Sequence, residues 1–312
     1  MRRRVRVGYN RAMNETHASN AGKELMASGM SRDYMLIHTA TLLFGLAGLF
    51  GKLVHLSPVA IVFGRVFFAA LFLGPVILLA GRPLRLASTR DYLLMALQGL
   101  ILAVHWGTFF RSIQVSSVAV GLLTFATFPV FTTLLEPLFD STSFRWRTLA
   151  PALWTLAGVF LVVPRFHPGE PVFEGALWGL ASGLTFAVLS LLNRRFGKRY
   201  HGAVVSFWQD AAAVLVLLPV LFLFPQIPTA TDLGYLLLLG VLFTGVSHTL
   251  FIQGMKTVSA RKASIIASLE PVYGIAAACL LLGEVPTARS LAGGAMILAA
   301  ALWVTLRKVK AP

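Results

Sequence analysis

The sequence predicts an all-α integral membrane protein whose ten transmembrane helices form two inverted repeats of five helices each. Three observations support this fold class: ten long apolar runs, positive charges placed in alternate gaps between the runs, and residues of the first half that recur in the second. Of the 312 residues, 57% are hydrophobic and only 12% are charged, a composition that makes a soluble core implausible.

Most of the apolar runs are near the roughly 20 residues that an α-helix needs to cross about 30 Å of hydrocarbon. The fifth and tenth runs are the shortest. In chain order the runs are Tyr34–Gly51, Pro58–Ala80, Tyr92–Phe110, Ser116–Phe139, Thr148–Pro164, Glu174–Asn193, Ala203–Phe224, Leu233–Gly254, Ala263–Leu282 and Ser290–Leu306.

The distribution of Lys and Arg predicts the orientation of these helices. The gaps after odd-numbered runs hold only Lys52, Arg111, Arg165 and Arg289, and Arg65 alone falls inside a run. All other Lys and Arg residues lie in the two tails or in the gaps after even-numbered runs. Because positive loops stay in the cytoplasm, both termini of this multi-pass protein are expected to be cytoplasmic.

The formal net charge of +15 would suggest a nucleic-acid partner in a soluble protein. In a membrane protein the same charge orients the helices and contacts anionic lipid, so we expect membrane lipid and no nucleic acid as partners. The first thirty residues contain no apolar stretch and are not a cleavable signal peptide. The single cysteine, Cys279, excludes a disulfide framework within one chain.

The two halves of the chain resemble each other. Aligning Pro129 with Pro271, a shift of 142 residues, also pairs Val with Val and Phe with Tyr at the next two positions. A shift of 144 places Phe63, Ala69, Pro75 and Val76 over Phe207, Ala213, Pro219 and Val220. The predicted domains are a cytoplasmic tail at 1–33, repeats at 34–165 and 173–307, and a cytoplasmic tail at 308–312. Because five is odd, the second repeat enters the membrane from the opposite face, as is typical of secondary transporters that work by alternating access.

Three stretches carry a family resemblance: GRVFFAALFL in the second run, FATFPVFTTLLEPLF in the fourth, and ASLEPVYGIAAACLLLGEVPTARSLAGGAMILAA across the ninth and tenth. With these the chain resembles the EamA-type ten-helix members of the drug/metabolite transporter superfamily, and among them the bacterial aromatic amino-acid exporters. The Gly283–Glu284 pair has no counterpart in the first half. The resemblance implies an amino-acid or metabolite exporter in the bacterial inner membrane, with helices 1–4 and 6–9 around a central cavity and helices 5 and 10 at the periphery.

Ionisable side chains at membrane depth are costly and often functional. Arg65 is expected either to attract a substrate carboxylate or to pair with a carbonyl or an acid of a neighbouring helix. Asp210 and Glu270 are the deepest acids, and each suits a substrate ammonium, a proton site or a packing role. Glu136 lies within a turn of a cytoplasmic helix end, from which its side chain is expected to reach the interface.

Other polar and aromatic side chains are candidates for the substrate pathway. His105, Ser247 and His248 either line a cavity or join helices by hydrogen bonds. Trp106 and Trp208 lie inside their helices, away from the interfaces where Trp is common, so they either stack on an aromatic substrate or pack in the core.

Two prolines are predicted hinges. Pro129 and Pro271 are repeat mates near the middle of the fourth and ninth helices. Each removes one backbone hydrogen bond and favours a kink, about which half a helix can swing.

The sequence contains none of the motifs HExxH, GxSxG or GxxxxGK[ST], so neither an enzyme nor an ATP-driven pump is expected, and no catalytic residue or cofactor is assigned. The seven His are scattered, which argues against a metal site. The predicted function is a secondary transporter that exports amino acids, aromatic or otherwise neutral, or related small metabolites by alternating access, as a chain compatible with a monomer. A multidrug exporter of the same fold and a channel-like facilitator are the alternatives.

Overall fold

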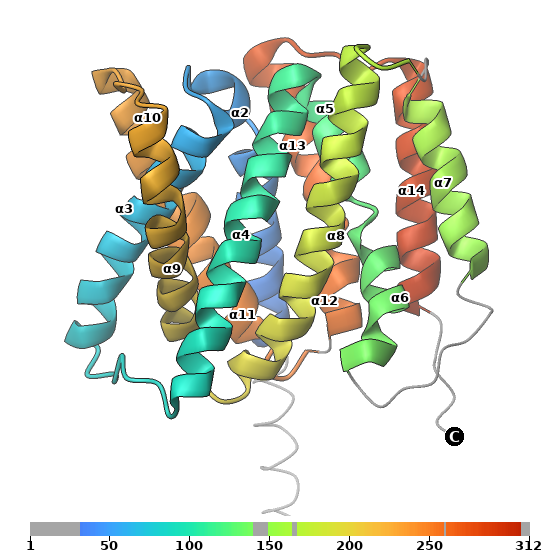
Figure 1. Cartoon of the computed structure of the whole chain (residues 1–312). Coiled ribbons are helices and arrows are strands. Elements are labelled where there is room, and N and C mark those ends of the chain that lie inside the picture. The colour runs from blue at the N-terminus through green and yellow to red at the C-terminus, as the bar shows by residue number, and fades with distance from the viewer. Residues whose placement is uncertain (1–31, 140–148, 164–166, 259, 307–312) are drawn as a thin grey trace, which may run out of the picture.

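The computed structural model describes residues 32–139, 149–163, 167–258 and 260–306, and every regular element in these ranges is a helix (Figure 1). Predictions for both tails, for the last residues of the first repeat and for Arg165 therefore lie largely outside the described residues. The first helix, 32–47, passes through a turn into α2 (Phe50–Leu53). The next helices are α3 (Pro58–Leu79), α4 (Thr89–Val115), α5 (Val118–Phe125), α6 (Phe128–Phe139), α7 (Leu149–Val162), α8 (Pro171–Gly197) and α9 (Gly202–Leu223). They are followed by α10 (Ala230–Gly240), the π-helix η2 (Val241–Val246), α11 (Ser247–Gly254), α12 (Ala260–Ala267), α13 (Glu270–Leu282) and α14 (Ala288–Leu306).

The chain is a multi-pass membrane protein. Within the described ranges, seven segments are long and apolar enough to cross a membrane: Arg32–Leu53, Pro58–Leu79, Thr89–Val115, Val118–Phe139, Pro171–Gly197, Gly202–Leu223 and Ala230–Gly254. Shorter apolar helices occupy Ala150–Val162, Glu270–Leu282 and Ala288–Ala300. Each of the ten predicted apolar runs falls on one of these segments. The predicted bounds were too narrow for α4 and α8, because the helical backbone continues through the polar residues Thr89–Asp91 and Arg111–Ser112 of α4 and through Pro171–Phe173 and Arg194–Arg195 of α8.

Two of the predicted helices are broken rather than kinked. The fourth run divides into α5 and α6, and the ninth divides into α12 and α13. Pro129 and Pro271 are the second residues of α6 and α13, so each break lies just before the proline. Proline lacks the N–H that would bond to the carbonyl one turn back, and it is tolerated in the first turn of a new helix.

The helix bounds repeat at the shifts seen in the sequence. Adding 142 to the bounds of α5 gives those of α12, and adding 144 to the bounds of α3 gives those of α9. The backbone hydrogen bonds around the breaks also correspond: the amide of Thr127 bonds to the carbonyl of Thr124, as that of Leu269 does to Ile266. The two halves therefore share local structure as well as residues.

The π-helix η2 was not predicted. It interrupts the eighth helix between α10 and α11, and the Thr244 hydroxyl donates to the carbonyl of Leu239, five residues back, at 2.8 Å. Single π-turns are rare and are frequent at functional sites, because they change which backbone groups and side chains face a neighbouring helix.

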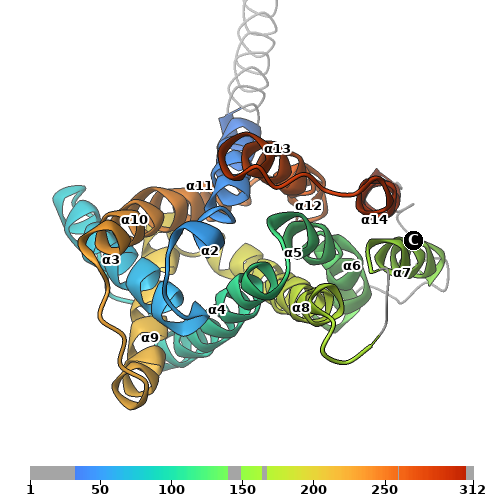
Figure 2. The same ribbon diagram turned by 90° about the horizontal axis from the view of Figure 1, so that it is seen from above.

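The helices surround a continuous apolar core, and one helix pair lies apart from it (Figure 2). α4 packs between α8 and α9, α3 packs on α9 and α10, and α5 packs on α8 and α13. α7 and α14 lie side by side at one edge of the bundle. The first helix approaches α13 at Gly45 and Gly274, where a Cβ on Gly274 would lie 2.6 Å from the Gly45 carbonyl oxygen. This contact fixes the start of α13 against the first helix.

Candidate functional site

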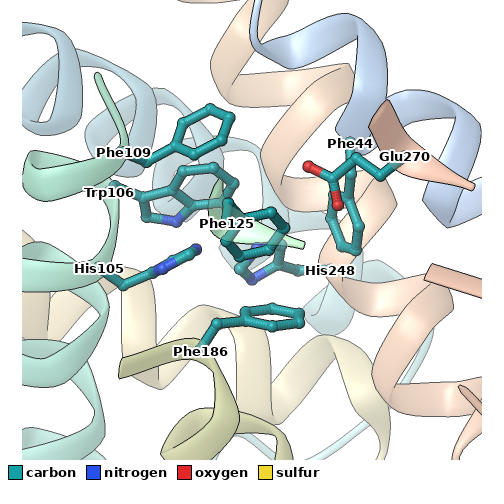
Figure 3. A pocket seen from close by; sticks show the side chains of 8 residues that line it. All are labelled: Phe44, His105, Trp106, Phe109, Phe125, Phe186, His248 and Glu270. Atoms are coloured by element: carbon teal, nitrogen blue, oxygen red, sulfur yellow. The ribbon is translucent and has the colours of Figure 1, made fainter. Parts of the chain in front are cut away.

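A small cavity lies among the helices, close to the helix breaks (Figure 3). Its volume, measured as space open to the centre of a water molecule, is about 10 Å³, which is about what one water needs. The cavity is mainly aromatic, and six elements contribute to it. Its lining residues are Phe44 of the first helix, His105, Trp106 and Phe109 of α4, Phe125 of α5, Phe186 of α8, His248 of α11 and Glu270 of α13.

Glu270 carries the only carboxylate among these lining residues. It is the first residue of α13 and is 3% exposed. Figure 3 shows its carboxylate pointing toward the space beside Phe44 and Phe125. No Lys or Arg side chain of the described residues lies within 4.0 Å of this carboxylate, so the wall of the cavity holds an acid without an ion-pair partner.

His105 is fixed in the opposite wall by α8. Its Nδ1 lies 3.1 Å from the carbonyl oxygen of Ser182 and 3.0 Å from the hydroxyl of the same residue. A bond to a carbonyl requires the hydrogen on Nδ1, so in the neutral imidazole Nε2 carries the lone pair. The ring packs against Phe125 and Phe186, with centroids 5.7 and 5.2 Å away.

His248 completes the wall on the side of α11. Its ring is stacked on Trp106, with centroids 5.6 Å apart, and meets Phe44 edge-on at 5.3 Å. His248 Nε2 and Trp106 Nε1 are buried, and neither has a hydrogen-bond partner within the part of the chain that the structure describes.

Arg65 does not line the cavity, although it contacts a residue that does. Its guanidinium carbon lies 3.3 Å from the centroid of the Trp106 ring. Nε donates to the hydroxyl of Thr244 at 2.9 Å, and Nη2 donates to the carbonyl of Phe243 at 3.2 Å. Both acceptors belong to η2, so the π-turn supplies the hydrogen-bond acceptors for a fully buried guanidinium. Of the two predicted roles for Arg65, this geometry is that of a structural pair with a carbonyl.

Asp210 of α9 lies near Arg65 without reaching it. Asp210 is 0% exposed, and no ion pair within 4.0 Å joins it to Arg65. Both carboxylate oxygens of Asp210 and Nη1 of Arg65 lack a hydrogen-bond partner among the described residues. This second buried acid is outside the lining of the cavity.

Two predicted pathway residues lie elsewhere. Trp208 donates from Nε1 to the carbonyl of Leu84 at 2.8 Å, and its ring meets Tyr92 edge-on at 5.0 Å, so it packs against the segment between α3 and α4. Ser247 is fully buried and donates to the carbonyl of Thr244 at 3.3 Å. Neither residue lines the cavity.

Ion pairs connect helices at both ends of the bundle. At one end Lys52 Nζ lies 3.9 Å from Glu284 Oε1 and donates to the carbonyl of Ser116 at 3.0 Å. At the opposite end Arg194 Nη1 lies 3.8 Å from Glu136 Oε1, so Glu136 pairs with a neighbouring helix. Figure 1 shows α2 and the end of α13 at the top and the ends of α6 and α8 at the bottom.

Sequence reasoning placed four of the eight lining residues on the pathway and missed four: Phe44, Phe109, Phe125 and Phe186. The chain contains 23 Phe, and nothing in their spacing separates these four from the others.

Comparison with known proteins gives consistent results. Residues 32–163 and 173–306 each match the sequence model of the EamA-like transporter family. An uncharacterized transporter of Archaeoglobus fulgidus is 28% identical over 264 residues, which cover 84% of this chain and 92% of the relative. An S-adenosylmethionine uptake transporter of Rickettsia bellii is 23% identical over 84% of this chain and 87% of its own. A solved protein crystal structure, 19% identical, covers 90% of this chain and 98% of its own with a TM-score of 0.66, which shows that the fold is shared.

Proposed function

The chain belongs to the EamA-like transporter family, and we propose that it is a secondary transporter that moves amino acids or closely related small metabolites across the bacterial inner membrane by alternating access. The observation that carries the proposal is the central cavity, whose wall contains at a helix break a carboxylate that no Lys or Arg of the described residues pairs with. Broken helices whose ends face a central binding site are common in secondary transporters.

The proposed architecture is ten membrane-crossing helices in two inverted repeats with cytoplasmic termini. It is supported by the matching bounds of α5 with α12 and of α3 with α9, and by the two family matches of similar length. Reporter fusions test it: the loop at Arg194–Arg199 is expected in the cytoplasm and the loop at Arg165–Glu170 in the periplasm. A cytoplasmic position for the second loop would contradict the inverted repeat.

The direction of transport has two candidates. The resemblance described above favours export of aromatic or other neutral amino acids, whereas relatives named as S-adenosylmethionine uptake transporters favour import of a larger amino-acid derivative. Flux of amino acids and of S-adenosylmethionine into reconstituted vesicles, measured for each orientation of the protein, distinguishes these candidates. Counter-flow would support a carrier, and non-saturating flux without counter-flow would indicate a channel-like facilitator. Saturable flux restricted to structurally unrelated drugs would indicate a multidrug exporter.

At least one of the two buried acids is proposed to act in transport. Glu270→Gln and Asp210→Asn remove a charge while keeping size and hydrogen-bonding capacity. Transport at wild-type rates across pH in both variants, with normal expression, would show that neither charge is needed. We propose His105, Trp106 and His248 as pathway residues because they line the cavity. Trp208 and Ser247 do not line it, and we assign them no contact with the solute.

A further inference from the structure

We propose that the cavity, which has room for about one water in this structure and must widen to admit a solute, binds the positively charged centre of an organic cation, such as an ammonium, a sulfonium or a quaternary ammonium group, beside Glu270 and between Phe44 and Phe125. This inference rests on the proposed function in one respect only, that the cavity is the solute-binding site. It adds the chemical class of the ligand group and the place where that group lies.

The charge of the cavity lining determines which charge a ligand must carry. Glu270 is the only acid in the lining, it is buried, and no basic side chain of the described residues reaches it. A buried carboxylate without a partner is strongly unfavourable, and either a proton or a cationic ligand relieves that cost; we assign the cation because the aromatic rings beside Glu270 also favour it. The two imidazoles of the wall do not supply it, because His105 is tied to Ser182 and His248 is stacked on Trp106.

The aromatic rings beside Glu270 favour a cation over a neutral group of the same shape. The electron-rich face of an aromatic ring attracts cations within about 6 Å of its centroid. Trp106 already stacks on the Arg65 guanidinium, at 3.3 Å, so its ring is a poorer site for a second cation. The phenyl rings near the carboxylate in Figure 3 carry no such neighbour, which places the ligand cation beside Phe44 and Phe125.

The same geometry argues against a carboxylate receptor at Arg65. A substrate anion would have to displace Trp106 from the guanidinium and would compete with two hydrogen bonds to η2. Only Nη1 of Arg65 is without a partner in the described part of the chain, and it does not line the cavity. Tighter binding of an anion than of a cation would therefore contradict the proposal.

The test is equilibrium binding to the full-length protein in lipid nanodiscs, measured by titration calorimetry. Two pairs of probes have nearly the same shape and differ in charge: choline with 3,3-dimethylbutan-1-ol, and 2-phenylethylamine with 2-phenylethanol. In at least one pair the cation is expected to bind about tenfold or more tightly than its neutral partner. 3-Phenylpropionate, which carries a carboxylate in place of the amine, is expected to bind more weakly than 2-phenylethylamine.

Variants locate the site. Glu270→Gln is expected to lower cation affinity by about tenfold or more and to leave the affinity of the neutral probes unchanged. Phe125→Leu keeps an apolar wall without a ring face and is expected to lower cation affinity alone. Glu174→Gln is the matched control, because Glu174 pairs with Arg111 at 2.9 Å at an exposed position outside the cavity and should not change either affinity.

Three results would overturn the inference: no saturable binding of either cation, equal binding of cation and neutral partner in both pairs, or tighter binding of 3-phenylpropionate than of 2-phenylethylamine. The wild-type comparison does not depend on whether a variant folds. Because binding is measured without flux, a protein that binds cations but carries no solute would overturn the transporter proposal and leave this inference intact.

Discussion

Thr244 holds the buried Arg65 in place, and its replacement by valine tests that role. The change keeps the shape of the side chain and removes the hydroxyl that accepts from Arg65 Nε at 2.9 Å. It also removes the bond from this hydroxyl to the Leu239 carbonyl at 2.8 Å within the π-turn. Both partners would then be left without these contacts in the interior of the bundle.

The expected loss of stability follows from the charge of the hydrogen-bond donor, Arg65. Hydrogen bonds between helices of a membrane protein contribute about 0.6 kcal/mol on average. Bonds to a charged group contribute about 1.5–3 kcal/mol, because the unpaired group keeps its desolvation cost. Since Arg65 is 0% exposed, the second range applies, and we expect Thr244→Val to lower the free energy of unfolding by about 2 kcal/mol.

The assay is reversible unfolding of the purified protein in mixed micelles of mild detergent and sodium dodecyl sulfate. Thr244→Ser keeps the hydroxyl and should lose less than about 1 kcal/mol, chiefly through one missing methyl group. Thr249→Val is the matched control on the same helix, because the Thr249 hydroxyl is buried without a hydrogen-bond partner among the described residues. It should be neutral or stabilising. Equal loss of stability in Thr244→Val and Thr249→Val would refute the role assigned to Thr244.

Two further predictions concern the helix breaks and the contact beside the cavity. Pro129→Ala and Pro271→Ala should preserve folding, slow transport and shift cysteine labelling of cavity positions toward opposite faces of the membrane. Unchanged transport and labelling in both variants would mean that the prolines only shape packing. Gly274→Ala would place a methyl group 2.6 Å from the Gly45 carbonyl oxygen, so it should lower the free energy of unfolding by about 1–3 kcal/mol. Gly234→Ala, where no atom lies within 4 Å of the added carbon, should leave it unchanged or raise it; equal effects of the two alanines would contradict the close contact.

The periodicity and charge of the sequence predicted the helices well, because hydrocarbon imposes a length and a polarity that few other environments require. Each run overlaps a helical segment of the described residues, and the fourth and ninth are broken just before Pro129 and Pro271. The π-helix at Val241–Val246 was not predicted, because its turn contains an additional residue and its Phe243 and Thr244 are contacted by Arg65, which lies far away in the chain. The local sequence does not reveal a contact between two helices that are distant in the chain.

The candidate site was predicted in part. Rare polar residues in apolar helices are conspicuous, and this signal found His105, His248 and Glu270. Phenylalanine is common throughout the chain, so the four phenyl rings of the wall were hidden among similar residues. Arg65 was found by its charge, but its partner Trp106 was known only after the helices were placed in three dimensions.

The small size of the cavity has a consequence for the kinetics of the proposed alternating-access cycle. Both ends of the bundle are joined by ion pairs while the space between them admits about one water molecule. A carrier whose empty binding site occupies so little volume can reorient that site across the membrane without bound solute. Such a carrier is not restricted to one-for-one exchange, and it can deplete one compartment of solute. We therefore expect net efflux from preloaded vesicles into solute-free buffer, at a rate limited by this unloaded return step.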